Sequence, residues 1–231
     1  IEGCVAVQAD QSEEETIFLL DQASKNSFIK GVVGWLDIKS SKLNDLLSYY
    51  TKYSSFKGSR HIVQNEKDVN FMLKSDFQRG LSCLEEYNLT YDILIKEHQM
   101  DQAIKMVKKN PNQIFILDHI GKPIISKNVD STWIKNINEL SLNENVFCKI
   151  SGLVTETKFF KWEIDDFKPF LDLIFDCFGV DRVMYGSDWP VCLIASTFED
   201  TINIVKNHIS SFSDNEKNKI MSLNAIKAYN L

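Results

Sequence analysis

The chain has 231 residues, of which 44% are hydrophobic and 25% charged, a balance typical of globular proteins and unlike that of disordered ones. Its apolar runs, such as 114–117, are far shorter than the roughly 20 residues of a membrane helix, and its start lacks the basic-then-apolar pattern of a signal peptide. The net charge is −6, and lysines alternate with acids instead of forming the basic stripe typical of nucleic-acid-binding proteins. We therefore expect a cytoplasmic protein whose partner is a small molecule rather than a nucleic acid or a membrane; the oligomeric state is left open.

The cysteine pattern also argues against a disulfide framework. The five cysteines form no Cys-x-x-Cys pair, and their number is odd. Most of them lie inside apolar segments, where a free cysteine behaves as a small hydrophobic residue. We expect reduced thiols rather than disulfides or zinc thiolates.

Strand-like apolar runs alternate with segments of helical period along the whole chain. The expected strands cover 4–9, 31–37, 58–62, 90–95, 114–117, 146–151 and 182–186. The expected helices cover 12–23, 43–50, 69–77, 100–107, 133–140, 167–178, 202–209 and 213–223. This alternation predicts parallel strands with helical crossovers in a single domain, residues 1–231.

The favoured fold class is α/β, as a distorted (β/α)8 TIM-type barrel. Seven strands are visible, and the stretch before Ile1 is the candidate position for an eighth, because the first residues already lead into a strand. The alternative is an open doubly wound sheet. No Gly-x-Gly-x-x-Gly turn follows any strand, so nothing supports the nucleotide-binding version of that alternative.

In a barrel of this kind the active site lies at the carboxyl ends of the strands. Polar residues stand at six of these ends: Gln8 and Asp10; Trp35 and Asp37; Arg60, His61 and Gln64; Asp118, His119 and Lys122; Lys149 and Ser151; Ser187, Asp188 and Trp189. Side chains so placed converge on one rim although their strands are far apart in sequence. The sequence thus predicts a polar site at this rim.

Asp188 is the strongest candidate within this set. An aspartate at such a position can simply cap the next helix. However, Trp189 and Pro190 follow, and the residue before a proline is pushed out of the helical region, which disfavours immediate helix entry. We therefore predict a functional carboxylate at Asp188.

The other candidates have structural alternatives as well. His119 stands in a polar strand end, which favours function over a role as a satisfied core histidine. His61 on its short strand fits either a functional or a hydrogen-bonded structural role. Lys122 can equally be a solvated loop lysine, and Trp35 and Trp189 fit core or lid packing as well as ligand contacts.

Four segments in order carry a resemblance to a known family: 60–64, 117–123, 149–156 and 186–190. With them the chain resembles the lactonase branch of the amidohydrolase superfamily, which includes fuconolactonases, rhamnonolactonases and pyrone-dicarboxylate lactonase. The resemblance extends over nearly the whole chain. It implies a distorted (β/α)8 barrel whose last strand carries the catalytic aspartate, which maps onto Asp188.

One motif of the family does not occur in this chain. The first strand of the family normally carries a His-x-His pair that helps to bind zinc or a similar ion, and the resemblance places it before Ile1. The lactonase branch is thought often to work without a metal. We expect no required cofactor, or one zinc-like divalent metal if a His-x-His strand precedes Ile1.

The first functional hypothesis is a hydrolase that opens a sugar (aldono-) lactone by attack of water. Asp188 would be the general base, because an ionised carboxylate can accept the proton of the attacking water. The other roles would fall to His119 and His61, which polarise the carbonyl, to Arg60 and Lys122, which bind hydroxyls or a carboxylate, and to Trp35 and Trp189, which stack on a sugar face. A sugar lactone is favoured over a pyrone dicarboxylate, because the chain has few arginines.

Two alternatives belong to other classes. In one, the protein is a metal-dependent amidohydrolase or decarboxylase with Asp188 and His119 as metal ligands. In the other, it is an inactive or truncated barrel that acts as a binding protein. Metal analysis discriminates the first alternative, and stabilisation by a ligand without turnover would point to the second.

Overall fold

The computed structural model describes residues 2–231, with the side chain of Phe159 excepted. All seven expected strands form, and they pair in chain order in one parallel sheet. They are β1 Cys4–Val7, β2 Ile29–Gly34, β3 Phe56–Ile62, β4 Thr90–Leu94, β5 Phe115–Leu117, β6 Val146–Ile150 and β7 Val183–Tyr185. A doubly wound sheet reverses its strand order at a switch point, whereas this order never reverses. The predicted barrel-type α/β fold is confirmed, and the open doubly wound sheet is wrong.

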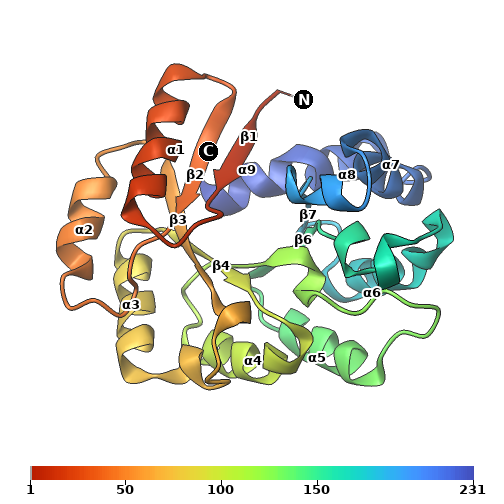
Figure 1. Ribbon diagram of the computed structural model, residues 1–231, viewed down its shortest axis with the longest axis horizontal. Helices are drawn as coiled ribbons and strands as arrows, with labels where there is room; N and C mark the ends of the chain where they lie inside the picture. Colours follow the sequence, from red (N-terminus) through yellow and green to blue (C-terminus); the bar gives the residue numbers. More distant parts are fainter. Residues whose placement is uncertain (1) are drawn as a thin grey trace.

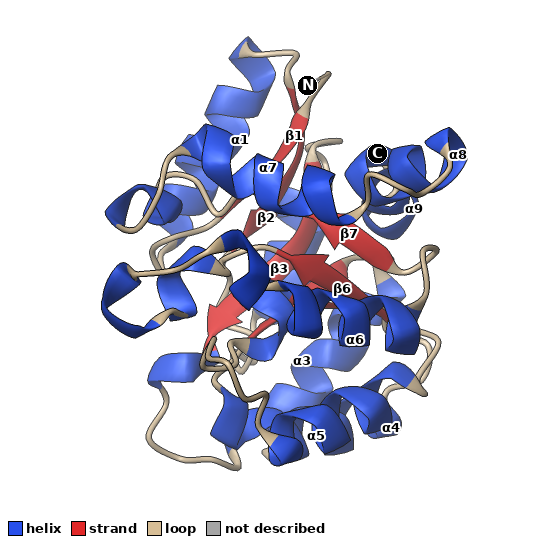
Figure 2. Cartoon of the chain, turned by 90° about the vertical axis from the view of Figure 1, so that its right-hand side faces the viewer, coloured by secondary structure: helices blue, strands red, loops and turns tan. Residues whose placement is uncertain are grey.

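The helices cover the outside of the curled sheet (Figures 1 and 2). They are α1 Glu13–Lys25, α2 Leu43–Tyr50, α3 Ser75–Glu86, α4 Met100–Lys109, α5 Ser131–Ser141, α6 Lys168–Phe178, α7 Phe198–His208, α8 Asp214–Asn218 and α9 Asn224–Tyr229. Their apolar faces follow the helical period: in α4, Met100, Ala103, Ile104 and Val107 are all buried. The sequence pattern therefore identifies the face that packs on the sheet.

Two expected helices differ from the prediction. The segment 69–77 is divided into a 3-10 turn, Phe71–Leu73, and the start of α3, because Lys74 between them is extended. The segment 213–223 begins with the expected capping box of Ser213 and Glu216 but continues as a π-helical turn, Lys219–Leu223. The spacing of apolar residues does not distinguish an α-helix from a short 3-10 or π-helical turn.

The interior of the curled sheet has its own small apolar cluster. Val33, Ile116, Phe147 and Met184 face inward from four strands. Residues of the C-terminal helix α9, including Tyr229, complete this cluster. Among residues 2–231, β1 and β7 are the edges of the sheet, and α9 lies beside both (Figure 1).

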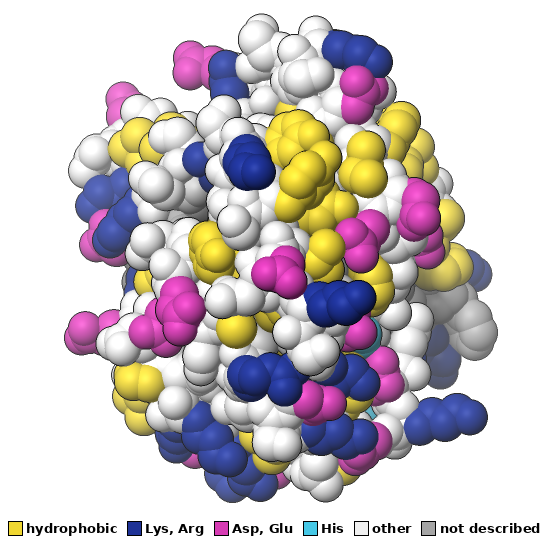
Figure 3. Space-filling view, turned by 90° about the vertical axis from the view of Figure 1, so that its left-hand side faces the viewer, with side chains coloured by type: hydrophobic (Ala, Val, Ile, Leu, Met, Phe, Trp, Pro, Cys, Tyr) yellow, Lys and Arg dark blue, Asp and Glu magenta, His cyan; other side chains and the backbone are white. Residues whose placement is uncertain are grey.

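The surface agrees with the charge pattern of the sequence. On the face that Figure 3 shows, Lys and Arg side chains are interspersed with Asp and Glu side chains. None of the helices in the described part of the chain combines the length and the hydrophobicity of a membrane span.

Candidate active site

A buried ionic network joins residues on or just after the strands β3 to β6. Lys149 on β6 places its Nζ 3.0 Å from Asp92 Oδ2 and 2.6 Å from Asp118 Oδ1. Arg60 on β3 places its Nη1 2.8 Å from the other oxygen, Oδ2, of Asp118. The hydroxyl of Tyr229 on α9 donates a hydrogen bond to Asp92 Oδ2 over 2.7 Å. Two cations and two carboxylates thus neutralise one another in the interior.

The pKa values show the mutual dependence of these charges. Burial alone would lower the pKa of Lys149, but Asp118 and Asp92 raise it well above its ordinary value. Burial alone would raise the pKa of Asp118, but Lys149 and Arg60 hold it well below its usual range. Burial raises the pKa of Asp92 and outweighs the opposing effect of Lys149. Each charge in the network is therefore stabilised by its oppositely charged neighbours.

Asp188 stands just after β7, at the edge of this network. Its backbone is left-handed, with φ 54°, and no α-helix begins at it; a 3-10 turn follows at Val191–Ile194. Its side chain is 15% exposed. Burial raises the pKa of Asp188 to about 6, with Lys122 lowering it and Asp118 raising it as smaller effects. A carboxylate with this pKa is ionised at neutral pH and more basic than an ordinary aspartate.

His119 faces Asp188 from the end of β5. Its Nε2 lies 3.8 Å from Asp188 Oδ1, and its Nδ1 lies 2.8 Å from the hydroxyl oxygen of Ser151, just after β6. Burial lowers the pKa of His119 to about 3, although Asp118 opposes this effect. The imidazole is therefore neutral at physiological pH.

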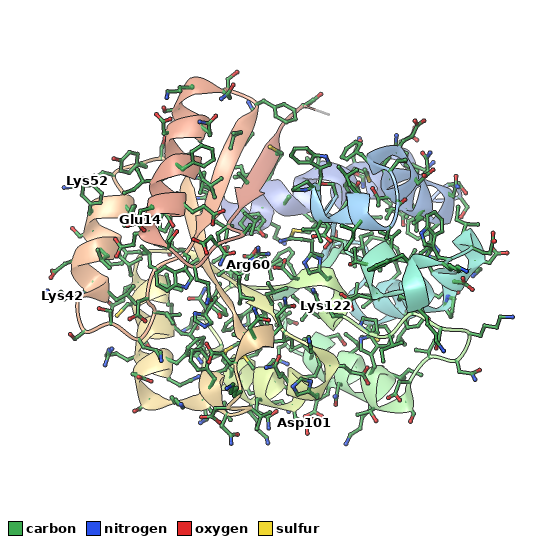
Figure 4. All side chains as sticks on the ribbon, in the orientation of Figure 1. Glu14, Lys42, Lys52, Arg60, Asp101 and Lys122 are labelled. Atoms are coloured by element: carbon green, nitrogen blue, oxygen red, sulfur yellow. The ribbon has the colours of Figure 1, made fainter. Side chains whose placement is uncertain are left out.

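Lys122 lies near His119 and Asp188, and its positive charge lowers the pKa of both. Its Nζ is 3.4 Å from Glu156 Oε1. Figure 4 shows Lys122 and Arg60 toward the middle of the molecule, whereas Lys42 and Lys52 lie at its periphery. The structure thus brings four predicted site residues to one region: Asp188, His119, Lys122 and Arg60.

His61 and Trp35 form a separate cluster beside this region. His61 Nε2 is 2.8 Å from Glu66 Oε1, and the indole Nε1 of Trp35 donates to His61 Nδ1 over 3.3 Å. The imidazole also stacks on Phe71, with 4.8 Å between ring centroids. Both ring nitrogens are thus engaged within the protein. Trp189 is different again, because it is 62% exposed at the rim.

Sequence reasoning missed part of the network. Asp92 is a charged residue in the middle of a fully buried strand, a signal that could have drawn attention to it. Tyr229 gave no such signal, because it lies in a short amphipathic helix 137 residues away from its partner. Lys149 and Ser151 stand at an expected strand end, but the sequence pattern indicates no particular role for either.

The donor set does not by itself fit a metal centre. His119 Nε2 and Asp188 are two donors facing each other, whereas a catalytic zinc takes three protein ligands. Residues 2–231 contain no group of three or more His, Cys, Asp or Glu side chains arranged to hold an ion. The described residues alone therefore do not complete a zinc site.

The sequence of this chain is similar to that of known proteins over most of its length. The family model described as amidohydrolase matches residues 2–231. An L-fucono-1,5-lactonase of Burkholderia multivorans is 33% identical over 238 residues, which cover 98% of this chain and 80% of that protein. A second L-fucono-1,5-lactonase, from Burkholderia ambifaria, is 30% identical over 200 residues, covering 87% of this chain and 69% of that protein.

A solved structure is similar over the whole chain. It is an amidohydrolase from Burkholderia multivorans with bound zinc, and it superposes with a TM-score of 0.96 at 32% identity, covering 100% of this chain and 84% of that one. The resemblance inferred from the four strand-end segments is confirmed. The chain belongs to the amidohydrolase family.

Proposed function

We propose that this protein hydrolyses a sugar lactone that carries no carboxylate, with Asp188 as the general base. The observation that supports this most is the pairing of an aspartate whose pKa is raised to about 6 with a neutral imidazole 3.8 Å away. Such a pair offers one group that accepts a proton and one that can donate a hydrogen bond. The names of the fuconolactonase relatives point to the same reaction.

The reaction divides into two steps. In the first, the Asp188 carboxylate takes a proton from water as the water oxygen bonds to the lactone carbonyl carbon, and His119 stabilises the negative charge on the carbonyl oxygen. In the second, the ring carbon–oxygen bond breaks, the carbonyl re-forms, and the leaving ring oxygen takes the proton from Asp188. The product is the open-chain hydroxy acid, and Asp188 is ionised again.

The charges at the site favour a neutral substrate. Arg60 pairs with Asp118, Lys149 with both Asp92 and Asp118, and Lys122 with Glu156. With Asp188, four carboxylates face three cations. A substrate carboxylate would therefore meet no cation without a partner among the described site residues, whereas lactone hydroxyls can bond to these charged groups.

The remaining predicted residues have supporting roles in the proposal. Arg60 and Lys122 would bind substrate hydroxyls, and Trp189 would cover the sugar from the rim. His61 and Trp35, which bond to each other, would shape the side of the site next to β3. The support for these roles is that the residues lie at or beside the carboxyl ends of the strands.

Acid release from neutral aldonolactones tests the proposal. Asp188→Asn keeps the shape of the side chain but cannot accept the proton, so we expect the hydrolysis rate to fall roughly 100-fold or more. Asp172→Asn on the exposed face of α6 is a matched control and should retain the wild-type rate. Metal content is measured on the same samples before and after chelation. Equal rates for wild type and Asp188→Asn would refute the assignment, and loss of a stoichiometric ion together with activity would favour the metal-dependent alternative.

A further inference from the structure

The hydroxyl of Ser151 makes a single hydrogen-bonded contact in the described part of the chain. Its Oγ lies 2.8 Å from His119 Nδ1, and both side chains are buried, at 5% and 8% exposure. Ser151 follows β6, and His119 follows the adjacent strand β5, so the sheet itself sets the two residues side by side. On the other edge of the same imidazole, Nε2 faces Asp188.

A neutral imidazole carries one proton, and the two possible tautomers satisfy these neighbours differently. If Nδ1 carries the proton, it donates to Ser151, the serine proton has no acceptor among the described residues, and the lone pair of Nε2 faces the Asp188 carboxylate. If Nε2 carries the proton, Ser151 donates to Nδ1 and the Nε2–H group points toward the carboxylate. The second arrangement gives the buried serine proton an acceptor and aims an N–H group, rather than a lone pair, at the negative charge of Asp188, at 3.8 Å, which is an electrostatic contact and not a hydrogen bond.

We propose that Ser151 is a positioning residue that holds His119 in the Nε2–H tautomer, so that the imidazole presents a donor to the reacting carbonyl oxygen. This inference rests on the proposed lactone hydrolysis, in which that oxygen becomes negative. A neutral imidazole without this constraint would populate both tautomers, and the Nδ1–H form would present a lone pair to the oxyanion. Ser151 is not assigned as a nucleophile, because its hydroxyl is buried at the Nδ1 edge, away from Asp188.

The backbone around the two side chains is fitted to this contact. Gly152 has φ +63°, and a Cβ there would lie 2.6 Å from His119 Nδ1. A Cβ at Gly186 would lie 3.0 Å from the Cβ of Ser151. A side chain at position 152 would therefore displace the His119 ring, and one at position 186 would crowd Ser151 and Lys149. Glycine at both positions leaves room for the contact between Ser151 and His119.

Nitrogen-15 NMR of the histidine rings tests the tautomer without using activity. The chain has four histidines, so the spectrum is simple, and His119→Gln identifies the signals of His119. We expect the wild-type signals to show the proton on Nε2, and Ser151→Ala to show a mixture of tautomers. A wild-type spectrum with the proton on Nδ1, or an unchanged spectrum in Ser151→Ala, would overturn the inference.

Kinetics with a neutral aldonolactone test the consequence for catalysis. We expect Ser151→Ala to lower kcat roughly 10- to 100-fold with little change in KM, because only donation to the oxyanion is affected. Ser151→Thr keeps a hydroxyl and should recover most of the rate. The matched control is Ser141→Ala, a buried serine on α5 whose hydroxyl donates to the Asn138 carbonyl, and it should have the wild-type kcat.

The two proposals fail in different ways. A wild-type kcat in Ser151→Ala, with the rate lost in Asp188→Asn, would overturn the role of Ser151 and leave lactone hydrolysis standing. A wild-type protein that opens no lactone would refute the proposed function, while the NMR spectrum would still decide which nitrogen carries the proton.

Discussion

Three residues of the site adopt a left-handed backbone that is uncommon outside glycine. His119, Lys122 and Asp188 have φ values of 53°, 53° and 54°. Such a conformation costs roughly 1–2 kcal/mol for each residue. A left-handed residue turns the chain sharply at the end of a strand. An extended residue there would continue the direction of the strand. Strain concentrated at one rim is typical of functional sites.

The pH dependence of the reaction follows from the environment of Asp188. Burial raises its pKa from 3.8 to about 6, and only the ionised form can accept a proton. We therefore expect kcat/KM to be level above about pH 7 and to fall about tenfold for each pH unit below about pH 6. Initial rates over this range measure the profile. An acid limb near the ordinary aspartate value of about 3.9 would contradict this prediction.

At the level of single residues, the strand-end rule predicts that Asp188, His119, Lys122 and Arg60 lie close together, and the structure places them in one region. The rule predicts this proximity because the carboxyl ends of parallel strands must meet at one edge. It could not give the partners of these side chains, which depend on rotamers and on distant segments. His61 illustrates this, because its bonds to Trp35 and Glu66 follow from packing that no local pattern encodes.

Among the elements, the helix α9 connects the end of the chain to the site. Its Tyr229 is buried in the sheet interior, and its hydroxyl donates to Asp92, which also binds Lys149. The strands and most helices were predictable, because short apolar runs and helical spacing reflect burial on one face. The helix α9 at the end of the chain was not predictable, because a segment of six residues is too short to define a helical periodicity.

Replacing Tyr229 measures how much its hydrogen bond to Asp92 contributes to stability. Tyr229→Phe removes the hydroxyl and leaves the ring in place, so Asp92 loses one charge-assisted hydrogen bond. We expect the free energy of unfolding to fall by about 1.5–3 kcal/mol in urea titrations. Tyr49→Phe is the control, because the Tyr49 hydroxyl contacts the Tyr53 hydroxyl at the exposed surface and its loss should have little effect. Equal stability of the two variants would show that the bond to Asp92 contributes nothing.

At the scale of the whole molecule, the ionic network ties β3, β4, β5, β6 and α9 together. The alternation of strands and helices predicted the barrel-type sheet, because parallel strands require crossovers. The network was not predictable, since its partners are between 31 and 137 residues apart. In this network each charge is buried together with a charge of opposite sign instead of alone.

Removing one cation should therefore affect the entire fold. Lys149→Met leaves Asp92 and Asp118 without their shared partner, and we expect a loss of about 3–5 kcal/mol in the free energy of unfolding. Lys108→Met, which removes an exposed pair with Glu139, should change the stability by less than about 1 kcal/mol. Thermal and urea unfolding of both variants provide the comparison. A loss no larger for Lys149→Met than for Lys108→Met would mean that the network does not stabilise the fold.

Hydrolysis of a neutral aldonolactone in water enriched with heavy oxygen tests the central claim most directly. If Asp188 activates water for attack on the carbonyl carbon, mass spectrometry will find one heavy oxygen atom in the carboxyl group of the hydroxy acid. Asp188→Asn will form this labelled product at a rate close to that without protein. An unchanged lactone with wild-type protein, or labelled product formed as fast by Asp188→Asn, would contradict the claim.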